Sequence, residues 1–148
     1  MKKNIILVDA QNSTDVHEPL LGLISIGSVL KKKGYEVKII RILSDNIEKI
    51  SKFIDKTTLA VGFSVKTIQI APSLEVSKSI KKNFPYIKII WGGVHPNLHP
   101  GQVLENENID IVVGDGEYTM LEIVKRLSLI HISEPTRPLY ISYAVFCL

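Results

Sequence analysis

Short apolar runs rich in isoleucine and valine alternate along the chain with longer stretches whose apolar residues recur three and four positions apart. The short runs predict β-strands because their length and their glycine or polar boundaries are those of strands: Asn4–Ala10, Tyr35–Ile42, Thr58–Val65, Ile87–Gly93 and Ile109–Gly116. The longer stretches mostly place lysine or glutamate opposite the apolar residues and predict helices: Leu20–Gly34, Asn46–Asp55, Ile70–Phe84, Pro100–Asn108 and Glu117–Leu127.

This alternation indicates an α/β fold. Strands that are apolar along nearly their whole length are buried on both faces, as in a parallel sheet covered by helices. We predict one doubly wound, flavodoxin-like domain with a five-stranded parallel sheet in the order 2-1-3-4-5. Ligands of such sheets bind outside the carboxyl ends of the strands, near the switch point. Polar residues and glycines collect at that edge, in segments 9–22, 64–67, 92–96 and 114–117.

Composition and charge narrow the class of protein. A chain of 148 residues, 45% hydrophobic and 22% charged, can bury the core of one soluble domain. The net charge of +3 comes from lysines without interleaved aromatic or arginine residues, so we predict a solvated face and no nucleic-acid partner. No apolar run reaches the roughly 18 residues of a membrane span, and the N-terminus becomes polar too early for a signal peptide. We therefore expect a cytoplasmic protein without a membrane partner.

The last segment, Leu127–Leu148, breaks off the helical pattern and then follows no period. Its string LSLIHISEPTR is one reading frame of a transposase sequencing adapter, and ISYAVFCL is the flow-cell sequence that follows that adapter. We expect a domain of residues 1–126, a non-native tail of residues 127–148, and a natural protein that continued past Arg126. The only cysteine, Cys147, lies in this tail, so residues 1–126 offer no thiolate for a disulfide, a zinc site or an iron–sulfur cluster.

Other ligand sites of this fold lack their residues here. No Gly-x-Gly-x-x-Gly follows the first strand, which argues against ordinary dinucleotide binding. A receiver domain needs a phosphate-accepting aspartate at the end of the third strand, where this chain has GFSVKT. The loop AQNSTDVHEPLLG is long and contains Pro19, so a flavodoxin-type phosphate loop is only a weak alternative.

Four segments taken together resemble one family. They are EPLLGLISIGSVLKKKGYEVKII, VGFSVKT, IKIIWGGVHPNLHP and IDIVVGDGEYT. Their order and spacing are similar to the cobalamin-binding domain that precedes the radical S-adenosylmethionine (SAM) barrel in B12-dependent radical enzymes, many of them methyltransferases. The resemblance covers nearly all of residues 4–126. It implies cobalamin as cofactor, and a barrel with SAM and a [4Fe–4S] cluster in the missing C-terminal part.

The implied function is a cobalamin-binding module that presents the corrin to a radical SAM barrel of the same full-length chain, for methyl transfer or a related radical reaction. This chain contains no Cys-x-x-x-Cys-x-x-Cys, so its own enzymatic activity stays open. The alternative is a regulatory or interaction domain of the same fold that binds a smaller ligand or a protein partner.

Cobalamin is a wide corrin disc with a long nucleotide tail, so its domain needs a flat mouth above the strand ends and a slot beside the sheet. The resemblance implies these cofactor-binding positions: Asp9, Leu20, Leu21, Gly22, Ser64, Val65, Thr67, Gly92, Gly93, Val94, His95, Gly114, Gly116 and Glu117. We expect the glycines of the last two strand ends to let the tail pass close to the backbone. Ser64 and Thr67 can hydrogen-bond it, and the segment 20–22 would pack beneath the corrin.

Several of these positions have a purely structural alternative. Gly92 and Gly93 could turn the chain out of its strand, and Ser64 could be a satisfied loop hydroxyl. Asp9 could be a turn residue or a helix cap instead of a corrin contact. Glu117 could cap the last helix, where a carboxylate favours the N-terminal dipole.

The stretch TDVHEPLLG raises the question of whether His17 binds cobalt. Many cobalamin proteins hold cobalt from below with an Asp-x-His-x-x-Gly loop. Here the third position after His17 is Leu20, the glycine comes only at Gly22, and Pro19 lies between. We therefore predict no metal-ligating residue in this chain, with His17 near the rim of the corrin.

Overall fold

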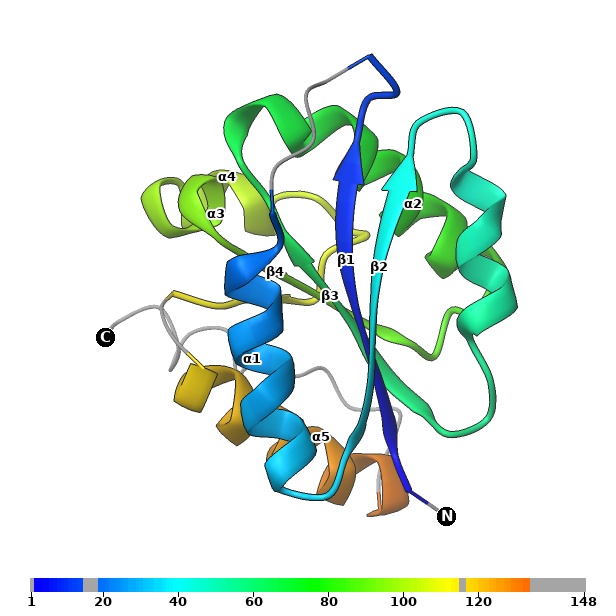
Figure 1. Cartoon of the computed structure of the whole chain (residues 1–148), viewed down its shortest axis with the longest axis vertical. Helices are drawn as coiled ribbons and strands as arrows, with labels where there is room; N and C mark the ends of the chain where they lie inside the picture. Colours follow the sequence, from blue (N-terminus) through cyan, green and yellow to red (C-terminus); the bar gives the residue numbers. More distant parts are fainter. Residues whose placement is uncertain (1, 15–18, 115–116, 134–148) are drawn as a thin grey trace.

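Five parallel strands form one sheet in the order β2-β1-β3-β4-β5, which confirms the predicted doubly wound, flavodoxin-like fold (Figure 1). The strands are β1 Asn4–Gln11, β2 Glu36–Leu43, β3 Thr58–Ser64, β4 Lys88–Gly92 and β5 Ile111–Val112. This computed structural model describes residues 2–14, 19–114 and 117–133, with the side chains of 117 and 130–133 outside the description. β5 is shorter than predicted; its ladder with β4 pairs Ile90 with Ile111 and Trp91 with Val112.

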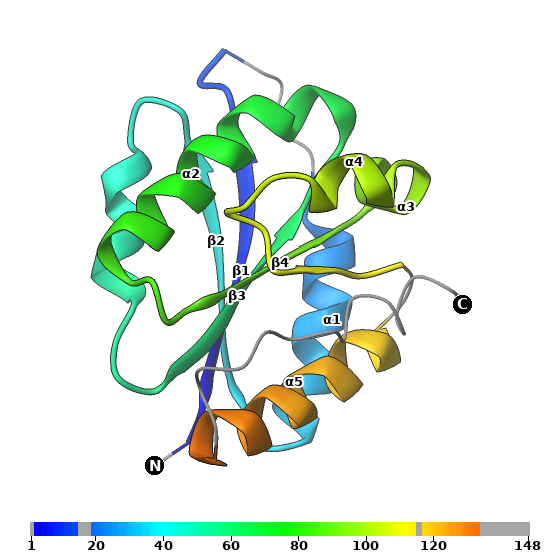
Figure 2. The ribbon, with the colours of Figure 1, turned by 180° about the vertical axis from the view of Figure 1, so that it is seen from behind.

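Helices cover both faces of the sheet (Figures 1 and 2). They are α1 Leu21–Lys32, η1 Ile47–Phe53, η2 Thr67–Gln69, α2 Ile70–Asn83, α3 Val94–Leu98, α4 Pro100–Leu104 and α5 Glu117–Ser133. Helices α1 and α5 lie side by side on one face, and α2 and η1 pack together on the other. The predicted helix Asn46–Asp55 is the 3₁₀ helix η1, while α3 and η2 were not predicted because such short turns carry no apolar period.

Successive residues of the strands point to opposite faces and build two cores. Ile6 and Val8 belong to the cluster beneath α2, whereas Ile5 and Leu7 belong to the cluster beneath α1 and α5. Every residue of β1 is buried, because this central strand has a neighbour on each side and a helical layer on each face.

Helix α5 does not end at the predicted Leu127 but continues to Ser133. Leu127 is only 3% exposed and packs in the cluster beneath α1 and α5. The helix therefore shows no break at the predicted domain boundary after Arg126, and that boundary stays a prediction. Within the described ranges, no helix combines the length and apolarity that a membrane crossing requires.

Candidate functional site

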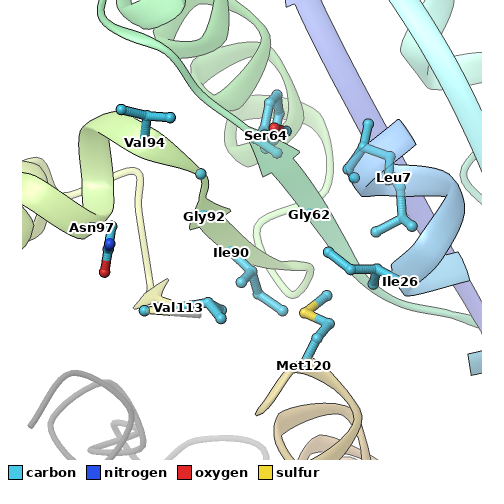
Figure 3. Close-up of a pocket in the computed structure, with 15 residues that line it drawn as sticks. Leu7, Ile26, Gly62, Ser64, Ile90, Gly92, Val94, Asn97, Val113 and Met120 are labelled. Carbon is cyan, nitrogen blue, oxygen red and sulfur yellow. The ribbon is translucent and has the colours of Figure 1, made fainter. Parts of the chain in front are cut away.

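A slot of about 380 Å³ opens at the carboxyl edge of the sheet and runs along the face that α1 and α5 cover (Figure 3). Its volume lies within the roughly 300–1,000 Å³ of small-molecule sites. Apolar residues of β1, β4, α1 and α5 and Gly62 of β3 line the part farther from the strand ends: Leu7, Ile26, Gly62, Ile90 and Met120. The mouth is lined by residues at or just after the ends of β3, β4 and β5: Ser64, Gly92, Gly93, Val94, Val113 and Gly114.

Gly62, in the middle of β3, keeps the slot open. A Cβ at this position would lie 3.2 Å from Cδ2 of Leu7 and 3.2 Å from Cε of Met120. Both atoms are ends of flexible side chains, so an added methyl group would take up slot volume without meeting the backbone. Gly62 was not among the predicted site residues. The available signal was an isolated glycine within an apolar strand, which can mark a close approach of a ligand.

Gly92 and Gly93 line the mouth of the slot, but for different reasons. Gly93 has φ +102°, and a Cβ on it would lie 2.9 Å from the backbone nitrogen of Val65, so the backbone itself requires glycine. A Cβ on Gly92 would lie 3.6 Å from Cβ of Val113, an ordinary contact. The structural alternative, a turn out of the strand, therefore holds for Gly93, which lines the slot as well.

A second hollow, of about 200 Å³, adjoins the slot above the end of β1. Gly22, Leu23 and Ser64 line both hollows, so the two are continuous at the start of α1. This second hollow is more polar, because Asp9 and Gln69 contribute to its wall. Together the two hollows run from the switch point between β1 and β3 down one face of the sheet.

Asp9 is the centre of a buried polar network in this second hollow. It is 6% exposed, and its Oδ2 accepts hydrogen bonds from Nε of Arg41 and Nε2 of Gln11, each at 2.8 Å. Its Oδ1 accepts a hydrogen bond from Nε2 of Gln69 at 2.7 Å. Asp9 lies within β1, so the alternatives of a turn residue or a helix cap were wrong. The network joins β1, β2 and η2, and it stabilises a charge that burial alone would penalise.

The structure brings most of the predicted positions together. Those that line the slot are Gly22, Ser64, Gly92, Gly93, Val94 and Gly114. Those that line the second hollow are Asp9, Leu20, Gly22 and Ser64. Gly116, the side chain of Glu117, and His17 lie outside the described residues.

Four predicted positions line neither hollow. Val65 is fully buried, and its carbonyl accepts the backbone N–H of His95 at 3.0 Å. His95 is 6% exposed, with Nδ1 3.5 Å from Oγ1 of Thr67, so both side chains are turned toward each other. Leu21 is 72% exposed. The sequence placed these residues at the carboxyl edge of the sheet, but contacts between segments distant in the chain, such as that of His95 with Thr67, orient their side chains.

Several exposed apolar side chains lie on the segments that follow the strand ends. They are Leu21, Ile24, Ile68, Val94, Leu98 and Tyr118, each more than half exposed. Of these, Val94 lines the slot and Ile68 lines the second hollow. Such a gathering of large apolar groups at one edge marks a surface that contacts a ligand or a partner. Among them only Leu21 and Val94 were predicted.

Residues 8–124 match the sequence model of the B12 binding domain. The chain belongs to the B12-binding domain family. Its cofactor is therefore cobalamin, as the four segments implied. The described residues fit this cofactor: Gly62 leaves a narrow slot beside the sheet, and exposed apolar side chains lie on the segments that follow the strand ends.

Individual proteins are also similar to this chain. The anaerobic magnesium-protoporphyrin IX monomethyl ester cyclase of Synechocystis sp. is 29% identical over 117 residues, 74% of this chain and 23% of the cyclase. A structure of the radical SAM methyltransferase TsrM from Kitasatospora setae matches with TM-score 0.72 and 17% identity, over 84% of this chain and 26% of TsrM. A cobalamin-binding protein from Desulfitobacterium hafniense matches with TM-score 0.62 and 20% identity, over 84% of this chain and 58% of that protein. The chain thus spans about a quarter of the first two proteins, and the two structures show the fold.

Proposed function

We propose that this chain binds cobalamin with the nucleotide tail in the slot and the corrin over the carboxyl edge of the sheet. We further propose that it presents the cofactor to a radical SAM barrel of the same full-length protein, for methyl transfer or a related radical reaction. The observation that carries the proposal is the slot beside Gly62 at the carboxyl edge of the sheet, the edge at which exposed apolar side chains, here called its rim, follow the strand ends.

The residues of the site have distinct tasks in this proposal. Ser64 and Asn97 offer hydrogen bonds at the mouth of the slot, where the polar phosphate and ribose of the tail would pass. Exposed side chains of the rim, such as Leu21 and Val94, cover one face of the corrin. When bound, cobalamin supplies a cobalt centre that can carry a methyl group. The network around Asp9 joins the neighbouring end of β1 to β2 and η2.

The radical SAM barrel rests on the relatives, since TsrM is a radical SAM methyltransferase whose structure also holds cobalamin and a [4Fe–4S] cluster. The gene beyond the codon of Arg126 should then encode Cys-x-x-x-Cys-x-x-Cys, because three thiolates hold such a cluster and leave one iron for SAM. Reading that part of the gene tests this half of the proposal. An uninterrupted natural sequence without the motif would favour the alternative, a regulatory or interaction domain.

Cofactor binding is tested by titrating hydroxocobalamin into the purified chain and following its visible spectrum and its co-elution on gel filtration. Binding at roughly tens of micromolar or tighter is expected. Gly62→Ala should weaken it about tenfold or more, because the methyl group enters the slot.

Gly101→Ala is the matched control, since a Cβ on Gly101 in α4 meets no atom within 4 Å and Gly101 lines neither hollow. This control should bind cobalamin like the parent chain. An absence of co-elution for the parent chain, or equal affinity for both variants, would contradict the placement of the tail in this slot.

A further inference from the structure

We propose that Asp9 makes the second hollow a site for a primary amide, and that the chain thereby rejects corrinoids in which one arm of the ring is a free carboxylic acid. The edge of the corrin ring of cobalamin carries acetamide and propionamide arms. The inference rests on the proposed function, because it assumes that the corrin lies over the carboxyl edge of the sheet. It goes beyond that function by naming the chemical group that the second hollow takes and the residue that selects it.

The second hollow lies within reach of a ligand that covers the mouth of the slot. The two spaces share Gly22, Leu23 and Ser64 in their walls. At about 200 Å³ the second hollow is smaller than the roughly 300–1,000 Å³ of sites that enclose a whole small molecule. It therefore suits one arm of a larger ligand whose body lies outside it.

The carboxylate of Asp9 has room for one more hydrogen bond. A carboxylate offers about four acceptor sites, and the described residues fill three of them. Arg41 and Gln11 both donate to Oδ2, whereas Oδ1 accepts from Gln69. The remaining site thus lies on Oδ1, on a side chain that is only 6% exposed and lines the second hollow.

The neighbouring amide of Gln69 is fully used within the protein. Its Nε2 donates to Oδ1 of Asp9 at 2.7 Å and to the carbonyl oxygen of Ala10 at 3.1 Å. Its Oε1 accepts the backbone N–H of Lys66 at 3.0 Å. Because Gln69 already donates both of its N–H groups, the acceptor on Asp9 needs a hydrogen from a ligand or from water.

A primary amide meets this need, and a carboxylate does not. An amide N–H can donate to Asp9, whereas a carboxylate has no hydrogen to donate and brings a second negative charge beside a buried one. Arg41 compensates the charge of Asp9, but it is not among the residues that line the hollow, so it does not lie between Asp9 and the ligand.

The donors in the wall of the hollow do not reverse this preference. Ser64 and Lys66 line the hollow and can donate to the carbonyl oxygen of an amide or to an oxygen of a carboxylate. The side chain of Lys66 is exposed, so water and salt screen its charge. These donors serve both groups, and the acceptor on Asp9 makes the difference between them.

The experiment measures dissociation constants of the full chain for cobalamin and for its monocarboxylic acids, in each of which one amide arm is hydrolysed. At neutral pH one of these isomers should bind about tenfold or more weakly than cobalamin, because a hydrogen bond to a charged group is lost. The isomers altered at other arms should bind within about threefold of cobalamin. The methyl ester of the selected arm, which is neutral but has no N–H, should bind about fivefold more weakly than cobalamin.

Asp9→Asn keeps the shape of the side chain and replaces an acceptor with an amide that can donate to a carboxylate. In this variant the affinity ratio between cobalamin and the selected acid should fall to about threefold or less. Asp45→Asn is the matched control, because it removes the same charge from an exposed residue that lines neither hollow. Its ratio should stay within about twofold of that of the parent chain.

Equal affinity of the parent chain for cobalamin and for every monocarboxylic acid would overturn the selection and leave the proposed function standing. A folded Asp9→Asn chain that keeps the ratio of the parent would overturn the role of Asp9. If Asp9→Asn fails to fold, the methyl ester decides, because an ester that binds as tightly as cobalamin shows that no N–H is required. A parent chain that does not bind cobalamin would contradict the proposed function itself.

Discussion

Neighbouring residues of β3 and β4 point to opposite faces of the sheet. On one face they fill the core, and on the other they leave a slot. Phe63 and Trp91 fill the face beneath α2, with ring centroids 6.2 Å apart and the Trp91 indole donating a hydrogen bond to Oγ of Ser77 at 3.1 Å. Gly62 and Ile90 face α1 and α5, where the glycine leaves a slot. The period of two thus lets the same two strands provide a filled core on one face and a binding site on the other.

This separation of tasks has an energetic consequence. Close packing beneath α2 should contribute mainly to the free energy of unfolding, because every removed side chain leaves a cavity there. The face beneath α1 and α5 already contains a cavity, so small changes in its lining should alter ligand affinity more than stability. Substitutions on the two faces can therefore be told apart by measuring both quantities.

The largest effect is expected from Trp91→Ala on the filled face. Trp91 is 1% exposed, so its removal leaves a large cavity and an unpaired hydroxyl on Ser77. The free energy of unfolding should fall by about 3–5 kcal/mol in urea denaturation followed by circular dichroism. A loss below about 1 kcal/mol would contradict the assignment of this face to stability.

The face of the sheet beneath α1 and α5, which contains the slot, is called the hollow face below. A smaller loss of stability is expected when α5, which covers this face, is shortened. Ending the chain after Arg126 removes the buried Leu127 and should lower the free energy of unfolding by about 2–3 kcal/mol. Ending it after Ser133 keeps Leu127 and is the matched control, with stability close to that of the full chain. Residues 134–148, part of the segment 127–148 that we propose to be adapter-derived, include the apolar stretch YISYAVFCL, so this control should also be more soluble.

Equal stability of the two shortened chains would show that the last turns of α5 contribute nothing to the hollow face. The domain boundary proposed after Arg126 would then coincide with the physical end of the fold. Unfolding of both shortened chains would instead contradict the proposal that residues 134–148 are foreign to it.

The smallest effect is expected from His17→Ala. If the hollow face and its rim hold the cofactor, this substitution should weaken cobalamin binding by less than about tenfold, or ~1.4 kcal/mol. A cobalt-bound imidazole must be neutral and would be released as it protonates, near a pKa of about 6.5 for an unperturbed group. We expect no such change in the bound cofactor's spectrum between roughly pH 8 and 5. A nitrogen superhyperfine splitting in the electron paramagnetic resonance of the cob(II)alamin form, lost in His17→Ala, would contradict this prediction.

The amino-acid sequence by itself determined the parallel sheet, its strand order and the edge at which the slot opens. These features depend on local signals, since the length and apolarity of runs such as Asn4–Ala10 are visible without any partner. The sequence also identified the family, because the four loops keep their order and spacing. Ser64, Gly92 and Gly114 were assigned to the site on this basis, and they do line the slot.

Only the tertiary structure decided which side chains share a space. Asp9 and Gln69 are 60 positions apart and are joined by a hydrogen bond that no local pattern announces. Gly62 matters because Leu7 of another strand and Met120 of the last helix approach the same point. Thr67 and His95 were expected at the cofactor but are turned toward each other. The direction of a loop side chain depends on the long-range contacts of its backbone, whereas a strand needs only its own period.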